Sequence, residues 1–258
     1  MTNVRISADL RLTASETGTY LDRRIEGPAS VAHHVQPDAG PDILFLINQT
    51  AGVFGGDSER WSLLVGPGVR VAMTDPGLKK LFAGPGVGRV AVDVEVGPEA
   101  ICLLVPHAIL PMAGSDSNIG TTIEVATDGR LLVSEIVCPG RVARGEQWGS
   151  STLTTNLLVS RHGSLVFADS FQTGLQTRRR GGYLLSVVAV GPGVCRRLVD
   201  EIRGDCPSAG VAMPEPQVLT AIGIVDTLQE SNALVRHVAD AWLRAHGDTP
   251  IEWRRLAY

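Results

Sequence analysis

The chain has 258 residues, which is long enough to bury a substantial core as one large domain or two small ones. Apolar residues make up 44% and charged residues 19% of the sequence, as in a folded globular protein rather than a disordered one. The net charge of −4 and the aromatic content of 5% provide neither the positive field nor the stacking surface that nucleic-acid binding uses. We therefore expect no nucleic-acid partner.

The N-terminal residues 1–18 alternate apolar and polar side chains and lack the apolar core of a signal peptide. No run approaches the roughly 18 apolar residues of a membrane span, so we expect no membrane partner. The four cysteines, Cys102, Cys138, Cys195 and Cys206, form no C-x-x-C pair, and three of them have apolar surroundings. This pattern predicts buried free thiols and a cytoplasmic location, where thiols stay reduced.

Period-2 alternation dominates the first two thirds of the chain, as in residues 69–73 and 90–96, and predicts half-buried strands between turns rich in glycine and proline. Four turn clusters resemble one another, and their fourth residues are Gly68, Glu99, Gly129 and Gly163, spaced 31, 30 and 34 positions apart. A recurring unit of about 30 residues predicts similar β-hairpins that stack and bury their apolar faces on one another. The alternative is an ordinary antiparallel protein, whose turns also recur at nearly regular spacing.

The last third of the chain has a different pattern. Apolar residues four positions apart predict a short helix over residues 195–204. Ser231 is the expected N-cap of a longer helix, whose apolar stripe consists of Leu234, Val238, Ala241, Trp242 and Ala245. Between the two helices, residues 218–226 predict a strand.

No linker rich in glycine, serine or proline divides the chain. We therefore expect a single domain over residues 1–258, β-rich over residues 1–190 and mixed helix and strand over residues 191–258. The expected fold class is mainly β, with hairpins or sheets stacked in a β-helix-like or two-layer arrangement and two helices in the C-terminal third.

The segment TAGVFGGDSERWSL, residues 50–63, holds three glycines close together. It lacks the G-x-x-x-x-G-K-[ST] order of a phosphate-binding loop and the G-x-G-x-x-G order of a dinucleotide-binding loop, and a strand rather than a helix is expected after it. Gly55 and Gly56 predict a tight turn in which Asp57 accepts backbone hydrogen bonds. A metal-ligand role for Asp57 is the alternative.

The sequence contains neither a G-x-S-x-G motif nor an H-E-x-x-H motif. A Ser/His/Asp triad comes together only in space, so a hydrolase with a spatially assembled site stays open as an alternative. His107 lies in an apolar stretch and is expected in the core, and no histidine has a partner at ligand spacing.

Two arginine-rich segments are candidates for docking a partner. Residues 177–182, TRRRGG, predict a solvated loop or a contact for an acidic partner. In residues 138–146, Arg141 and Arg144 lie three positions apart between glycines, and Glu146 follows them. These arginines predict either local salt bridges at a sheet rim or bidentate anchors for a partner's carboxylates.

Four motifs, GVFGGD, VAMTDPGLKKLFAG, LLVPHAILPMAGS and SEIVCPGRVARGE, follow one another along the chain. In order and spacing they resemble the motifs of the urease accessory protein UreD family, also called UreH. The resemblance assigns partner-binding or structural roles to Gly55, Gly56, Thr74, Lys79, Pro106, Gly140, Arg141, Arg144 and Gly145. The chain departs from the family pattern at Thr50-Ala51, Phe82, Ala83-Gly84 and Asp169-Ser170.

The resemblance implies a non-catalytic scaffold with a β-rich fold. Such a scaffold binds the urease apoprotein and a UreF-like accessory protein, and through the latter a UreG-like GTPase, to deliver Ni²⁺ to the urease active site. It implies no permanently bound cofactor and a transient passage of Ni²⁺, for which Asp57, Glu135 and Glu146 are the candidate ligands. A β-rich protein-binding module unrelated to urease is a further alternative.

Overall fold

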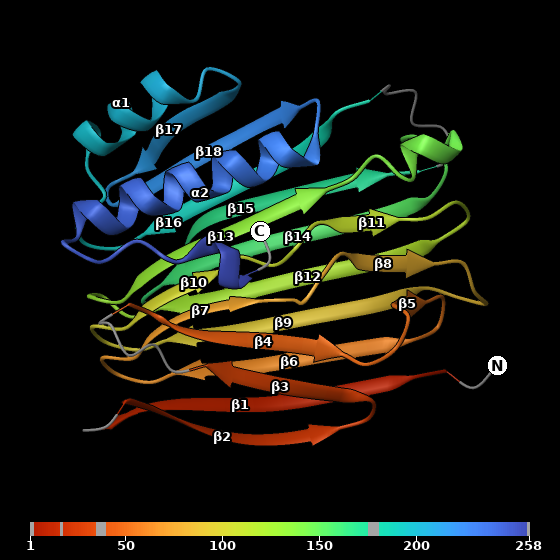
Figure 1. Ribbon diagram of the computed structural model, residues 1–258, viewed down its shortest axis with the longest axis horizontal. Helices are drawn as coiled ribbons and strands as arrows, with labels where there is room; N and C mark the ends of the chain where they lie inside the picture. The colour runs from red at the N-terminus through yellow and green to blue at the C-terminus, as the bar shows by residue number, and fades with distance from the viewer. Residues whose placement is uncertain (1–2, 16–17, 35–39, 175–180, 257–258) are drawn as a thin grey trace.

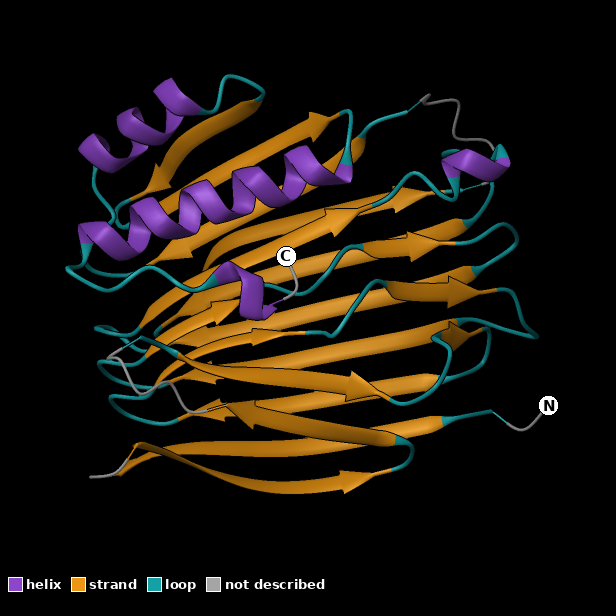
Figure 2. Ribbon diagram, in the orientation of Figure 1, coloured by secondary structure: helices purple, strands orange, loops and turns teal. Residues whose placement is uncertain are grey.

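The protein is built from two stacked β-sheets, with two helices on the outer face of one of them (Figures 1 and 2). The computed structural model describes residues 3–15, 18–34, 40–174 and 181–256. The expected mainly β fold with two helices in the C-terminal third is confirmed.

The first sheet has seven strands and presents its outer face to solvent. In spatial order it consists of β15 (Ser164–Thr173), β14 (Thr152–Arg161), β12 (Asp116–Val125), β9 (Gly88–Val96), β6 (Ser58–Val65), β1 (Arg5–Ser15) and β2 (Gly18–Glu26). Burial alternates along strands such as β6 and β12, because one face packs inward and the other is solvated.

The second sheet has eleven strands and lies between the first sheet and the helices. Its main path consists of β17 (Ala209–Glu215), β18 (Val218–Val225), β16 (Tyr183–Val190), β13 (Arg130–Val137), β10 (Ile101–Leu104), β7 (Arg70–Thr74), β4 (Asp42–Asn48) and β3 (Ala29–His34), and the short strands beside it are β5 (Val53–Phe54), β8 (Lys79–Phe82) and β11 (Ile109–Pro111). Strands β7, β10 and β16 are buried almost continuously, as expected for a sheet covered on both faces.

The sequence repeat corresponds to one coil of chain that visits both sheets. In the first sheet Trp61 and Thr121 both align with Val92, and in the second sheet Val71 and Leu131 both align with Cys102, all in parallel pairs. The spacing of about 30 residues is therefore the length of one coil, as in a β-helix.

The structure corrects the prediction that each repeat is a hairpin. The turns at Gly68, Glu99 and Gly129 connect strands of opposite sheets, and only the turn at Gly163, between β14 and β15, closes an antiparallel hairpin. Each coil therefore supplies strands to both layers. Gly68 and Glu99 occupy equivalent turn positions, with φ of 68° and 55°.

Two helices cover the outer face of the second sheet. Helix α1 (Arg196–Asp205) packs on β17, and α2 (Leu228–Ala245) contacts β13, β16 and β18. Ser231 is not the N-cap of α2: Thr227 is, because its hydroxyl accepts a hydrogen bond from the amide of Glu230 at 3.1 Å while the Glu230 carboxylate accepts from the amide of Thr227. Ser231 is buried within the first turn.

The cysteines agree with the expectation of buried free thiols. All four cysteines are free, and Cys102, Cys138 and Cys206 are buried while Cys195 is exposed. Within the described ranges, none of the helices combines the length and the apolar character that a membrane crossing requires.

The turn at Gly55 provides a test of the fold. A Cβ added to Gly55 would lie 2.5 Å from the carbonyl oxygen of Gly86 and 2.6 Å from that of Gly84. We expect Gly55→Ala to lower the free energy of unfolding by about 1–3 kcal/mol, because two backbone segments would have to separate. Urea denaturation measures the change. The matched control is Gly120→Ala, where an added Cβ would meet no heavy atom of the described chain within 4 Å; equal effects of the two substitutions would contradict the prediction.

Candidate functional site

Three loops interrupt the second sheet at the same level. The chain leaves the sheet after β4, β7 and β10 and rejoins it at β5, β8 and β11, so residues 49–52, 75–78 and 105–108 form a break in the layer. A surface pocket of about 220 Å³ opens at this break; we call it the outer pocket. Its lining includes Asn48, Glu59, Asp75 and Lys79. The outer pocket therefore connects the surface with charged side chains of the interior.

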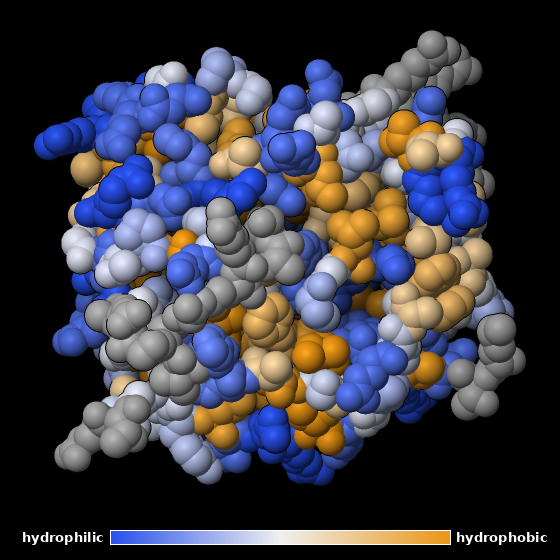
Figure 3. All heavy atoms as spheres, viewed as in Figure 1, coloured by the Kyte–Doolittle hydropathy of each residue, from blue (hydrophilic) through white to orange (hydrophobic). Residues whose placement is uncertain are grey.

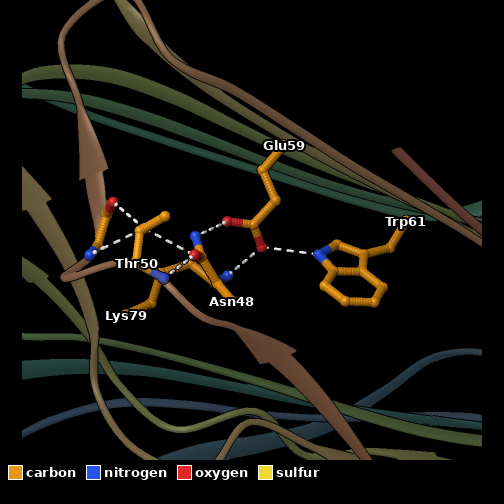
Figure 4. A network of polar contacts seen from close by, with 6 residues as sticks. Asn48, Thr50, Glu59, Trp61 and Lys79 are labelled. Carbon is orange, nitrogen blue, oxygen red and sulfur yellow. Dashed lines mark hydrogen bonds and ion pairs between the residues drawn. The ribbon is translucent and has the colours of Figure 1, made fainter. Parts of the chain in front are cut away.

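Glu59 lies at the base of the outer pocket and points inward from β6. It shares the inward positions of that strand with Trp61, Leu63 and Val65, and its side chain is 2% exposed. Its carboxylate accepts hydrogen bonds from Asn48 Nδ2 at 2.9 Å, Trp61 Nε1 at 2.7 Å and Lys79 Nζ at 2.7 Å (Figure 4). Burial alone would raise the pKa of Glu59, but the Lys79 ammonium and these donors hold it below its ordinary value. Glu59 is therefore a buried, ionised carboxylate.

Lys79 joins the two sheets, because it lies on β8 of the second sheet and pairs with Glu59 of the first. Burial would lower the pKa of Lys79, but the charges of Asp75 and Glu59 raise it above the ordinary value. Asp75 is 9% exposed, and burial raises its pKa to about 6 even though the Lys79 charge opposes the shift. Among the described residues, Asp75 Oδ2 has no hydrogen-bond partner.

A second cavity, which we call the inner cavity, lies between the two sheets and measures about 50 Å³. Leu46, Asp75 and Lys79 line both it and the outer pocket, so the two spaces meet at these three side chains. Glu135 of β13 lines the inner cavity. Burial, together with the nearby charge of Asp169, raises the pKa of Glu135 to about 7, although a hydrogen bond with Thr155 opposes the shift.

The charged side chains form a layer across an otherwise apolar interior. Along β13, Glu135 lies between Val133 of one apolar cluster and Val137 of another. Along β12, Thr121 lies in the same way between Ile119 and Ile123. We call Asn48, Glu59, Asp75, Lys79 and Glu135, together with Thr121 and Thr155, the polar belt. It runs from the outer pocket to the inner cavity and lies between parts of the two clusters, which Val92 still bridges.

The comparison with known proteins decides the family of this fold. The family model described as UreD urease accessory protein matches residues 5–256, nearly the whole chain. The chain belongs to the UreD family. The family description is that of an accessory protein rather than a catalyst, which argues against the hydrolase alternative.

Individual UreD proteins are similar to parts of the chain. It is 27% identical over 149 residues to the urease accessory protein UreD of Azoarcus sp. strain BH72, a match that covers 57% of this chain and 52% of that protein. It is 32% identical over 119 residues to the urease accessory protein UreD 2 of Synechococcus sp. strain JA-3-3Ab, covering 46% of this chain and 44% of that protein. It is 27% identical over 165 residues to UreD of Pseudomonas aeruginosa strain PAO1, a match that covers 62% of this chain and 59% of that protein. The chain thus spans about half the length of the curated relatives it matches.

Two of the UreD motifs meet at the polar belt. Lys79 is part of the belt, and Pro106 lines the inner cavity. Thr74 is buried at the end of β7, and its hydroxyl donates to the carbonyl of Asp75 at 3.3 Å. The second and third motifs therefore hold the loops that form the break in the sheet.

Asp57 stabilises the glycine turn, as the sequence predicted. Its two carboxylate oxygens accept hydrogen bonds from the amide of Val4 at 2.7 Å and from the amide of Phe54 at 2.9 Å. Gly55 and Gly56 form the turn itself. Both oxygens of Asp57 are therefore committed to the backbone, and its role as a metal ligand stays a prediction.

Glu146 closes the loop of the fourth motif. Its carboxylate accepts from the amide of Arg141 at 3.1 Å and from Arg141 Nε at 2.9 Å, and it also pairs with Nη2. Gly140 and Gly145 take positive φ values of 122° and 79° in this loop, and the hydrogen bonds from Arg141 lower the pKa of Glu146. Glu146 is not among the described residues that line either cavity. Arg144 is exposed in the 3₁₀ turn Val142–Arg144.

Asn48, Glu59 and Asp75 are residues of the site that were not predicted from the sequence. The sequence does indicate the direction of Glu59. It lies two positions before Trp61 and four before Leu63 on an alternating strand, so all three side chains point to the same, inward face. Asn48 and Asp75 lie where strands end, and only the tertiary fold brings them to Glu59. The arginines of the run 177–180 lie outside the described residues. Within the described ranges, no group of three or more His, Cys, Asp or Glu side chains is arranged to hold a metal ion.

The raised pKa of Glu135 predicts a pH-dependent stability. The pKa of Glu135 is about 7 in the folded protein against an ordinary value of 4.5. The loss of folding stability caused by its charge is therefore absent below pH 4.5 and complete above pH 7. Glu135→Gln carries no charge at this position. We therefore expect its unfolding free energy, relative to that of wild type, to be higher at pH 8 than at pH 5 by on the order of 2 kcal/mol. Chemical denaturation at both pH values measures this gain.

The matched control is Glu95→Gln, because Glu95 is exposed on β9. A difference between Glu135→Gln and wild type that does not change with pH would show that the Glu135 carboxyl is well solvated.

Proposed function

We propose that this chain is a non-catalytic urease maturation factor that binds the urease apoprotein and guides Ni²⁺ toward the urease active site. The polar belt is the observation that carries this proposal. It supplies carboxylates in a line from the outer pocket to the inner cavity, through an interior that apolar clusters fill on either side. Ni²⁺ is the cargo here rather than a resident cofactor.

The ligands of the belt fit a transient passage of metal. Glu59 lines the outer pocket, Asp75 lies where the two cavities meet, and Glu135 lies beyond it on the inner cavity. Carboxylate oxygens are weak ligands for Ni²⁺ compared with imidazole or thiolate, so a site with few of them releases the ion readily. Sequential weak sites favour transfer over storage.

The surface around the outer pocket supports partner binding. Apolar side chains gather over β8 and β11, the short strands beside the break, whereas the helices present mainly hydrophilic side chains (Figure 3). A depletion of charge at the centre with polar groups at the rim is typical of protein interfaces. We propose that urease and a UreF-like accessory protein dock on this side of the molecule, with a UreG-like GTPase joining through the latter. The three buried free thiols fit a role in the reducing cytoplasm.

Urease maturation in cells that lack this chain tests the proposal. We expect urease coexpressed with the other accessory proteins to acquire nickel and activity only when this chain is supplied, and to copurify with it. Active, nickel-loaded urease in the absence of the chain would contradict the proposal.

Copurification from the same cells tests whether the end of the fourth motif, residues 138–146, contacts a partner. We expect Arg144→Glu to weaken copurification about tenfold without changing the thermal midpoint, because Arg144 is exposed and a lost rim charge acts on association. Arg141→Glu is a poorer test, since Arg141 pairs with Glu146 and its reversal also lowers stability. Arg197→Glu, an exposed position on α1, is the matched control. Unchanged copurification of the Arg144 variant would remove this arginine from the interface.

A further inference from the structure

The Lys79 ammonium stands at the point where the outer pocket meets the inner cavity. It lines both spaces, and its Nζ is 2.7 Å from Glu59 Oε1. A cation that moves between the two spaces must pass this group, and like charges repel. An ammonium at this place opposes the movement of a cation between the two spaces unless it moves aside.

The two carboxylates beside Lys79 differ in the hydrogen bonds that they accept. Glu59 accepts three hydrogen bonds, whereas Asp75 Oδ2, buried in the same place, has no hydrogen-bond partner among the described residues. A buried polar atom without a partner costs free energy, and in a native protein it often marks the place of an ion, a water or a ligand. Here the unsatisfied oxygen belongs to a side chain that lines both cavities.

The charge balance favours a dication over the ammonium. Glu59 and Asp75 together carry two negative charges when ionised, and the single charge of Lys79 neutralises only one of them. A divalent cation placed between the two carboxylates neutralises both and gives Asp75 Oδ2 a partner. The lysine side chain is a flexible four-carbon stem, so its ammonium can withdraw toward the outer pocket and be hydrated there.

We propose that Lys79 is a built-in placeholder for a divalent cation, which displaces the ammonium from Glu59 and binds between Glu59 and Asp75. Displacement of the ammonium opposes binding, so the site is weak in the wild-type protein and the ammonium returns when the ion leaves. The biological meaning of this site, control of the passage of Ni²⁺, rests on the proposed function, whereas the binding itself is a property of the isolated chain.

Calorimetric titration of the untagged protein with Ni²⁺ tests the proposal. Lys79→Gln removes the charge and keeps an amide that can donate to Glu59. We expect this variant to bind one Ni²⁺ at least about tenfold more tightly than wild type. In the matched control, Lys79→Gln combined with Glu59→Gln, we expect that gain to be lost because one of the two carboxylates is gone. Equal affinities of Lys79→Gln and wild type, or a gain that survives Glu59→Gln, would overturn the proposal.

A second measurement on the wild-type protein decides the question if Lys79→Gln does not fold. Trp61 donates its indole N–H to the same Glu59 oxygen that pairs with Lys79, so its indole NMR resonance reports on the site. We expect paramagnetic Ni²⁺ to broaden this resonance, assigned with Trp61→Phe, before those of Trp148, Trp242 and Trp253. Broadening of the other resonances first would contradict binding at Glu59.

These outcomes are separate from the test of the proposed function. If the chain is required for urease maturation but neither titration shows binding at Glu59, the placeholder is wrong and the maturation role stands. If the site binds Ni²⁺ but urease matures without the chain, the proposed function is wrong and the cation site stands.

Discussion

The ion pair between Glu59 and Lys79 is the constraint on which the site depends. It joins a strand of the solvent-facing sheet to a short strand of the helix-covered sheet, at the level where three loops interrupt the latter. Removing one partner of a buried pair costs about 3–5 kcal/mol, because the remaining charge is left uncompensated in a poorly solvated place. The two residues therefore have to be present together, and their pairing fixes how the loop that carries Asp75 lies against the first sheet.

Stability does not explain why the interior contains this pair. Replacement of a buried ion pair by well-packed apolar residues is often neutral or stabilising, and here apolar clusters already fill the space on both sides. Glu135 adds to the argument, since burial raises its pKa to about 7 and its ionised form destabilises the fold near neutral pH. A row of such groups between an outer pocket and an inner cavity is consistent with the proposed transfer of a cation.

Much of the fold could be predicted from the sequence, because the alternation of apolar and polar residues and the spacing of the turns can be read from short segments. The repeat at Gly68 and Glu99 gave the length of a coil, but a turn alone does not say whether the next strand joins the same sheet or the opposite one. Ser231 is a plausible cap by residue type, but Thr227 is followed by Glu230 at capping-box spacing, so the sequence holds the correct signal four residues earlier. The site was harder to predict, since its residues meet only through the parallel register of distant strands.

Nickel loading of urease tests the account most directly, with the paired variant Glu59→Gln and Lys79→Gln in place of the wild-type chain. This variant removes both charges of the ion pair at once, so it avoids the unpaired Glu59 or Lys79 charge that either single substitution leaves behind. The account predicts that the variant folds and copurifies with urease, whereas the urease it matures contains much less nickel than that matured by wild type. A full nickel content with the paired variant would show that the polar belt plays no part in maturation.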